Sequence, residues 1–193
     1  MIKLSFYILS LLLSAYFTSY AQAGLPRPVT KEVLQKLITE VREEADEYAA
    51  SLKQQYDGTA GEFPRLSEEA LKFSKDSFSI ERMYNKRTNI DYSTAGINEA
   101  LTVKAEAYQR LINRYFEQMI RRLTQDDRKA LIAAQDAWTH FLRKELELMN
   151  ILAKAPYSDG GTIRSNIIQR HKAESTKSRA VMLFTYYDTL LQY

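Results

Sequence analysis

Two long stretches of this chain contain neither glycine nor proline, the residues that most often interrupt a helix. They cover residues 97–155 and 162–193, and in both stretches charges of both signs are mixed with apolar residues at helical spacing. No segment alternates apolar and polar residues between glycine or asparagine turns, as a β-hairpin would. The pattern predicts an all-α fold without a sheet.

Capping residues and short loops divide the rest of the chain. A serine or threonine often precedes a helix because its side chain accepts a hydrogen bond from the first turn. Apolar periodic segments begin near residues 30, 67, 94, 124 and 162, and the segment after residue 67 is the least regular of them. Because the connections are short, we predict an up-down antiparallel bundle of about four long helices.

The first 23 residues have the pattern of a secretory signal peptide. Lys3 is followed by an apolar run over residues 4–17 and then by Ala21-Gln22-Ala23, a small-residue cleavage site. The run is short for a segment that must span ~30 Å of hydrocarbon, which favours cleavage over retention as an anchor. We therefore expect a mature chain that begins at Gly24, is periplasmic or secreted, and contains no transmembrane segment.

The composition argues against several kinds of site. The chain has no cysteine, which rules out a disulfide, a thiol nucleophile or an iron–sulfur ligand, and it has only two histidines. A ferritin-like di-metal site needs a glutamate three residues before each histidine, but Ala137 and Ile168 stand there. The net charge of +3 on an exported chain argues against a nucleic-acid partner. We expect no metal and no cofactor.

Motifs for catalysis are also missing. The sequence contains no P-loop, no G-x-S-x-G elbow and no dinucleotide fingerprint. Asp126 and Asp127 are adjacent carboxylates, but their place at a predicted helix start favours capping over catalysis. We expect no catalytic residues and no enzyme activity.

Three segments, in a fixed order, carry a resemblance to a known family. The first is residues 134–141, Ala-Gln-Asp-Ala-Trp-Thr-His-Phe, after a Leu-Thr-x-Asp-Asp-Arg-x-x-Leu lead-in at residues 123–131. The second is the glycine pair in Gly160-Gly161-Thr162-Ile163, and the third is a T-x-x-R-x-x-x-L pattern at residues 176–183. Over about residues 93–190 the chain resembles the lysozyme-inhibitor LprI-like domain family, small exported bacterial helical domains.

The resemblance implies a function and a division of the chain. It implies non-covalent inhibition of lysozyme or a related muramidase; the alternative is an envelope structural or interaction module with a protein or polymer partner and no inhibitory activity. The signal peptide would cover residues 1–23, an N-terminal helical extension residues 24–92, and the LprI-like domain residues 93–193. The extension and the domain would form one compact unit, and the oligomeric state is left open.

The family-motif residues are expected to be structural. Core packing is the default role for the single tryptophan, Gln135 is placed to bond a neighbouring helix, and Arg179 is expected to pair with Glu145 or Asp136. The resemblance gives this set as Tyr115, Gln135, Trp138, Phe141 and Arg179.

This chain departs from the family at its cysteines. The family often has one eight residues after the tryptophan and another eight before the closing arginine, where Leu146 and His171 stand here. A further family cysteine falls on Ala100, and the family's arginine after the aromatic falls on Leu142, with Arg143 one place later. Loss of all the cysteines leaves no unpaired thiol.

The loop Tyr157-Ser158-Asp159-Gly160-Gly161 is the candidate partner-binding segment. It joins two predicted long helices and should project from one end of the bundle, where loops on rigid scaffolds often bind partners. Tyr157 would stack where a sugar ring lies in a lysozyme cleft, and Ser158 and Asp159 would offer a hydroxyl and a carboxylate. The alternative is a plain interhelical turn, in which the two glycines only supply unusual dihedral angles.

Overall fold

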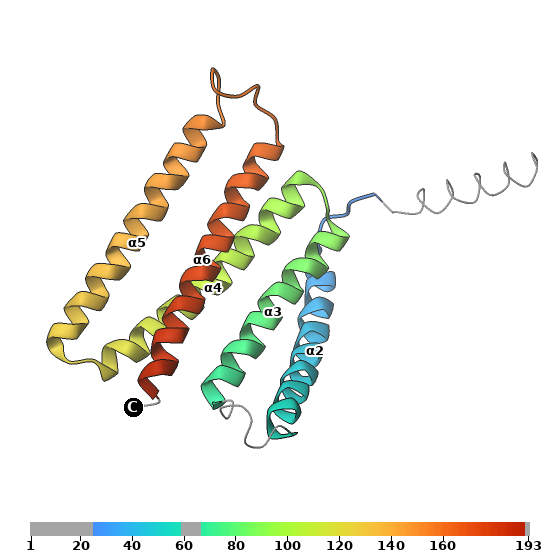
Figure 1. Ribbon diagram of the computed structural model, residues 1–193. Helices are drawn as coiled ribbons and strands as arrows, with labels where there is room; N and C mark the ends of the chain where they lie inside the picture. The colour runs from blue at the N-terminus through green and yellow to red at the C-terminus, as the bar shows by residue number, and fades with distance from the viewer. Residues whose placement is uncertain (1–24, 59–66, 192–193) are drawn as a thin grey trace, which may run out of the picture.

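The computed structural model describes residues 25–58 and 67–191, and these residues form helices without any strand (Figure 1). The all-α prediction is therefore confirmed for this part of the chain. The expected signal peptide, residues 1–23, lies outside the described residues. The helices are α2 (Lys31–Gly58), α3 (Glu68–Ile90), α4 (Thr94–Arg122), α5 (Gln125–Leu152) and α6 (Ile163–Leu191).

Side-chain caps account for where four of these helices begin, and the predicted cap Thr30 accepts a hydrogen bond from Val33 N at 3.3 Å at the start of α2. Ser67 Oγ accepts a hydrogen bond from Ala70 N, and Ser93 Oγ accepts one from Gly96 N, both at 3.0 Å. Thr124 Oγ1 accepts a hydrogen bond from the amide of Asp127 at 3.3 Å. Asp127 therefore lies in the first turn of α5, where a carboxylate is favoured by the helix dipole, as the capping interpretation required.

The helix count differs from the expected four because the irregular segment after residue 67 is a full helix, α3. It contacts α2, α4 and α6. A helix with neighbours on several sides has residues that are partly covered all round instead of along one stripe, so its sequence lacks a clear helical period. Phe73 lies in the central core, while Phe78 stacks on Tyr48 of α2 at a centroid distance of 4.5 Å.

The core lies between α4 and α6, whose contact is the most extensive in the fold. Tyr115 of α4 is fully buried and packs its ring edge-on against Phe73 and Phe184 at 5.6 and 5.3 Å. Burial raises the pKa of Tyr115 to about 12. The structure therefore places the first family-motif residue at the centre of the fold.

The helices form an open row and not a closed bundle. Successive helices alternate in direction, but α2 packs mainly on α3 at one edge, and α5 packs mainly on α6 at the other (Figure 1). The only buried hydrophobic residues of α5 are Leu131 and Leu142. A closed bundle needs every helix to bury a full apolar stripe, and α5 buries too little for that.

Neither a membrane span nor a metal cluster is found in the part of the chain that the structure describes. None of the helices within residues 25–58 and 67–191 is both long enough and apolar enough to cross a bilayer. The same residues hold no group of three or more His, Asp or Glu side chains arranged to ligate an ion.

Candidate functional site on the α5–α6 hairpin

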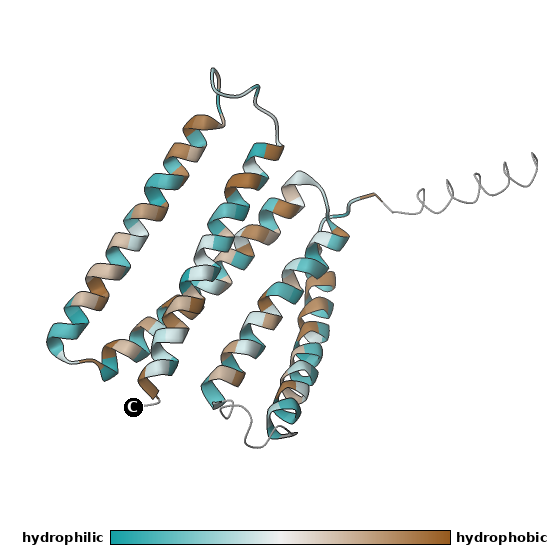
Figure 2. Ribbon diagram, in the orientation of Figure 1, coloured by the Kyte–Doolittle hydropathy of each residue, from teal (hydrophilic) through white to brown (hydrophobic). Residues whose placement is uncertain are grey.

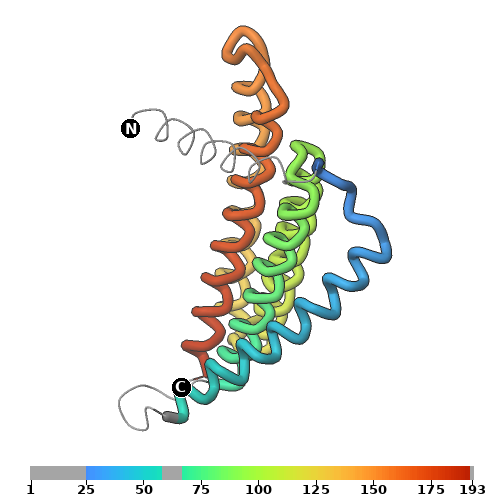
Figure 3. Tube along the Cα trace, turned by 90° about the vertical axis from the view of Figure 1, so that its right-hand side faces the viewer, coloured from blue at the N-terminus to red at the C-terminus, as the bar shows by residue number. Residues whose placement is uncertain are grey.

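The loop between α5 and α6 extends beyond the ends of the other helices, as two perpendicular views show (Figures 1 and 3). Tyr157 at its start is 67% exposed, and Asp159, Gly160 and Gly161 are exposed as well. The predicted projection of this loop agrees with the structure. None of the residues that the structure describes covers it.

The backbone of this loop requires its two glycines. Gly160 has φ +77° and Gly161 has φ +106°, a region that other L-residues rarely adopt. A Cβ atom at either position would meet no other atom within 4 Å, so the requirement is conformational and not steric. The two glycines therefore shape the turn, and this role is compatible with binding of a partner by the same loop.

The side chains of the loop differ in whether they already have a hydrogen-bond or ion-pair partner. Ser158 Oγ accepts a hydrogen bond from Gly160 N at 3.2 Å and helps to form the turn. Within the described residues, the side chains of Tyr157 and Asp159 make no hydrogen bond or ion pair. Tyr157 and Asp159 are thus the two loop side chains with unused binding capacity.

Three of the family-motif residues meet where α5 touches α6. Arg179 Nε donates a hydrogen bond to Gln135 Oε1 at 3.0 Å, and the Arg179 guanidinium lies 5.8 Å from the centroid of the Trp138 ring. Arg179 is buried, and burial lowers the pKa of its guanidinium. The bond between Gln135 and a neighbouring helix is as expected, and it joins residues that are far apart in the sequence.

The prediction that Arg179 pairs with Glu145 or Asp136 is wrong. Glu145 faces His171 of α6 instead, with 3.4 Å between Glu145 Oε2 and His171 Nε2. Asp136 is exposed and has no ion pair within the described residues. Arg179 lies against an amide and an aromatic ring because Gln135 and Trp138, not Asp136, are on the side of α5 that meets α6.

The Glu145–His171 pair lies at one of the positions where the resemblance places a family cysteine. The resemblance placed family cysteines at Leu146 and His171, and His171 here contacts the residue next to Leu146. A polar contact thus links α5 to α6 in the region where the family often has cysteines. It is partly exposed, so it contributes little to stability compared with a buried contact.

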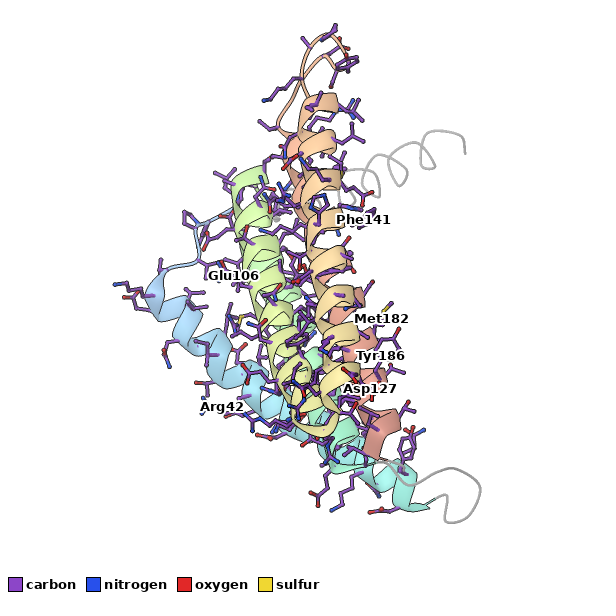
Figure 4. All side chains as sticks on the ribbon, turned by 90° about the vertical axis from the view of Figure 1, so that its left-hand side faces the viewer. Arg42, Glu106, Asp127, Phe141, Met182 and Tyr186 are labelled. Atoms are coloured by element: carbon purple, nitrogen blue, oxygen red, sulfur yellow. The ribbon has the colours of Figure 1, made fainter. Side chains whose placement is uncertain are left out.

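Phe141 does not join the core, contrary to the expected structural role. Its side chain is 59% exposed, whereas Trp138, one turn earlier, is partly buried against the core. Figure 4 shows Phe141, Met182 and Tyr186 on the same side of the α5–α6 pair. Leu148 lies seven residues after Phe141, on the same side of α5, and is also exposed.

We call the exposed residues Phe141, Leu148, Met182 and Tyr186 the α5–α6 face. Apolar residues are visible along the outer helix in the hydropathy view (Figure 2). Val181, Met182 and Tyr186 also line a shallow hollow on α6. The sequence alone does not indicate that Met182 and Tyr186 are exposed, because an apolar residue on a helix is expected to be buried until its neighbours are known.

The described residues thus form a helical domain with a projecting loop and an exposed apolar face. The family model described as "Lysozyme inhibitor LprI" matches residues 85–183. The match covers just over half of the chain, and the chain belongs to the lysozyme inhibitor LprI family. No curated protein and no solved structure was found to match the chain.

The matched range refines the expected boundary of the resemblance. It begins at residue 85, inside α3, and not at residue 93. It contains the whole of α4 and α5 and ends within α6. All of the loop Tyr157-Gly161 and all five motif residues lie inside it, whereas α2 and most of α3 lie outside.

Proposed function

We propose that this protein is exported to the periplasm or the exterior and there binds a lysozyme or a related muramidase without covalent chemistry. Family membership supports the class of partner. The Lys3, apolar-run and Ala21-Gln22-Ala23 pattern supports export. Inhibition then consists of occupying the substrate cleft.

The loop Tyr157-Gly161 is the contact in this proposal. The observation that carries it is the projection of the α5–α6 loop beyond the other helices, with Tyr157 and Asp159 exposed and unpartnered within the described residues. Tyr157 stacks where a sugar ring would lie, and Asp159 pairs with a cationic group at the rim.

Inhibition assays test the proposal. The protein is added to several types of lysozyme, and the rate of cell-wall lysis is measured. The double variant Tyr157→Ala and Asp159→Ala should lose at least tenfold in inhibitory potency with an unchanged melting temperature. The matched control, Asp126→Ala with Lys129→Ala, removes an exposed ion pair at the opposite end of α5 and should inhibit like the unchanged protein.

Two results would contradict this assignment in different ways. Full inhibition by the double loop variant removes the loop from the contact. No inhibition of any lysozyme by the unchanged protein removes the muramidase as partner.

A second candidate function is an interaction module without inhibitory activity, and the α5–α6 face favours it. Phe141, Met182 and Tyr186 are large apolar residues exposed on one side of two adjacent helices. Exposed apolar patches of this kind often bind other proteins. Changing Phe141 and Tyr186 to serine would abolish capture of an envelope protein in this case, while the loop variant would leave capture unchanged.

A further inference from the structure

A second site lies on the other side of the molecule, where α2, α3 and α4 enclose a groove of about 340 Å³. Its walls are apolar, with Ile38 and Val41 from α2, Ile80 and Met83 from α3, and Val103 from α4. The volume is within the range of small-molecule sites, ~300–1,000 Å³. Figure 4 shows Arg42, which lines this groove, on the opposite side of the molecule from Phe141.

Short side chains keep the groove open. Ala45 of α2, Ala100 of α4 and Ala107 of α4 all line it, and the first two are almost completely buried. A longer side chain at any of these positions would fill part of the space. Apolar surface that remains open to water is unfavourable, and a ligand with an apolar part would cover it.

Five cationic side chains also line the groove, and they differ in what they bind. Lys75 pairs with Asp46, and Lys104 pairs with both Glu81 and Glu174. By contrast, Arg42 and Arg110 are exposed and have no acceptor or acidic partner within residues 25–58 and 67–191. The groove therefore combines apolar walls with two guanidinium groups that are free to bind an anion.

Arg87 adds a further hydrogen-bond donor that has no acceptor among the described residues. It is only 6% exposed, and its Nη2 pairs with Glu99 at 2.5 Å. Its Nε–H is buried and has no acceptor within the described residues. A buried donor without an acceptor is unfavourable, and a bound anion or an anion-ordered water would relieve that cost.

The register of the helices places these cations at different points along the groove. On α3 and α4, Arg87 pairs with Glu99, and Asp76 pairs with Arg114. Arg110, just before Arg114, is therefore near the end of the groove that contains Lys75, whereas Arg87 is near the other end. An amphiphile along the groove can therefore place its charged head at a cationic end and its chain against the apolar walls.

We propose that this groove binds a single-chain amphiphile with a carboxylate head, that is, a fatty-acid anion. An alkyl chain fits walls of Ile, Val and Met side chains, and each methylene removed from water strengthens binding roughly fourfold. A guanidinium binds a carboxylate through two parallel hydrogen bonds.

This site is separate from the proposed muramidase contact. Its α2 wall and most of its α3 wall lie outside the matched family range, and none of its lining residues is in α5 or α6. Binding of a fatty-acid anion therefore neither requires lysozyme inhibition nor follows from it.

Calorimetric titration of the mature protein tests the proposal with three probes. Decanoate, below its micelle concentration, should bind with one molecule per chain. Decyltrimethylammonium, which has the same chain and the opposite charge, should bind at least tenfold more weakly, and acetate should not bind. Equal binding of the two ten-carbon probes would overturn the role of the cations, and no binding of decanoate would overturn the proposal.

Two variants locate the site. Arg42→Gln with Arg110→Gln should weaken decanoate binding at least tenfold, while Arg164→Gln with Arg170→Gln, two exposed arginines of α6, should leave it unchanged. Ala107→Phe should fill the groove and abolish binding, while Ala134→Phe on the exposed side of α5 should not. Unchanged binding by either groove variant contradicts the assignment.

A measurement on the unchanged protein makes the test independent of how the variants fold. Decanoate should shift the methyl NMR signals of Ile38, Ile80, Met83 and Val103, which line the groove. The methyl signals of Leu148 and Val181 should stay in place. If instead the signals of Leu148 and Val181 shift and those of the groove residues do not, decanoate binds near the α5–α6 face and the groove is not its site.

Discussion

Arg179 of α6 lies over the indole ring of Trp138 on α5, with its guanidinium carbon 5.8 Å from the ring centroid. The same guanidinium donates to Gln135, one turn before Trp138. Since Leu131 and Leu142 are the only buried hydrophobic residues of α5, these contacts are a large part of what holds α5 to α6. The family motif on α5 and the one on α6 are thus the two halves of one interhelical contact.

Replacing Trp138 by alanine should lower the free energy of unfolding by about 2 kcal/mol. Large-to-small changes of a fully buried Trp cost about 3–5 kcal/mol, and Trp138 is only partly buried. Urea denaturation followed by circular dichroism measures the change. Phe141→Ala is the matched control, because Phe141 is exposed and should change stability by less than about 0.5 kcal/mol.

Lys104 should be the most sensitive charged residue of the fold. It is 4% exposed and bonds Glu81 of α3 at 2.9 Å and Glu174 of α6 at 2.7 Å. Lys104→Met should cost about 1–2 kcal/mol, because it removes a buried cation that bonds two carboxylates, although Lys177 still pairs with Glu81 and Glu174 is exposed. The exposed Lys129→Met should be close to neutral in the same denaturation experiment, and equal costs for the two would contradict this interpretation.

Stability should fall in acid, and Glu44 should account for part of that fall. Hydrogen bonds from Arg82 and Lys86 lower the pKa of Glu44 from 4.5 to about 2. Because the folded-state pKa lies below the unfolded-state value, the stabilisation is complete above about pH 4.5 and is lost as the pH falls towards 2.

Glu81 should also contribute to the loss of stability in acid. Burial raises its pKa, but hydrogen bonds from Lys104, Lys177 and Tyr108 outweigh burial, and the net pKa is lowered. Melting temperatures from pH 7 to 2 measure the fall. The Glu44→Gln variant should be less stable than the unchanged protein at pH 7 and should approach it at pH 2; parallel curves would exclude Glu44 as a source.

Gly161→Ala should destabilise the α5–α6 loop by about 1–2 kcal/mol, because an L-residue is strained at positive φ. Nothing obstructs a Cβ atom there, so chirality alone should decide the effect. D-Alanine at the same position, introduced by chemical ligation, should be tolerated. Equal losses with the L- and the D-residue would show that the glycine is needed for another reason.

Exported protein should begin at Gly24, since the apolar run ends before the Ala21-Gln22-Ala23 cleavage pattern. The intact mass of protein from the periplasm or culture medium measures this. A membrane-bound species that keeps residues 1–23 would refute cleavage.

Local signals explain why so much of the helical structure could be predicted. Ser67, Ser93 and Thr124 cap helices through hydrogen bonds to amides three residues away, so the boundaries depend on neighbours in the chain. The irregular segment that became α3 could not be assigned with the same clarity, because its contacts with α2, α4 and α6 depend on distant residues.

The candidate sites depended on the tertiary structure in the same way. Trp138 and Phe141 are three residues apart on one helix, and only the position of α6 decides that the first is covered and the second exposed. Arg179 contacts Gln135 and not an acid because of which side of α5 faces it. The groove beside Arg42 and Arg110 exists only where α2, α3 and α4 meet, with alanines of α2 and α4 in its walls.

The sequence by itself determined that the chain forms helices, near which residues the described helices begin, and the family to which it belongs. Helical period, capping and motif spacing act over a few residues and can be read along the chain. Only the tertiary structure decided that α5 lies at the edge of an open row, that Phe141 faces outwards, and that two arginines stand unpaired beside an apolar groove. Those properties arise from packing between residues far apart in sequence, and no local pattern encodes which faces of the helices will meet.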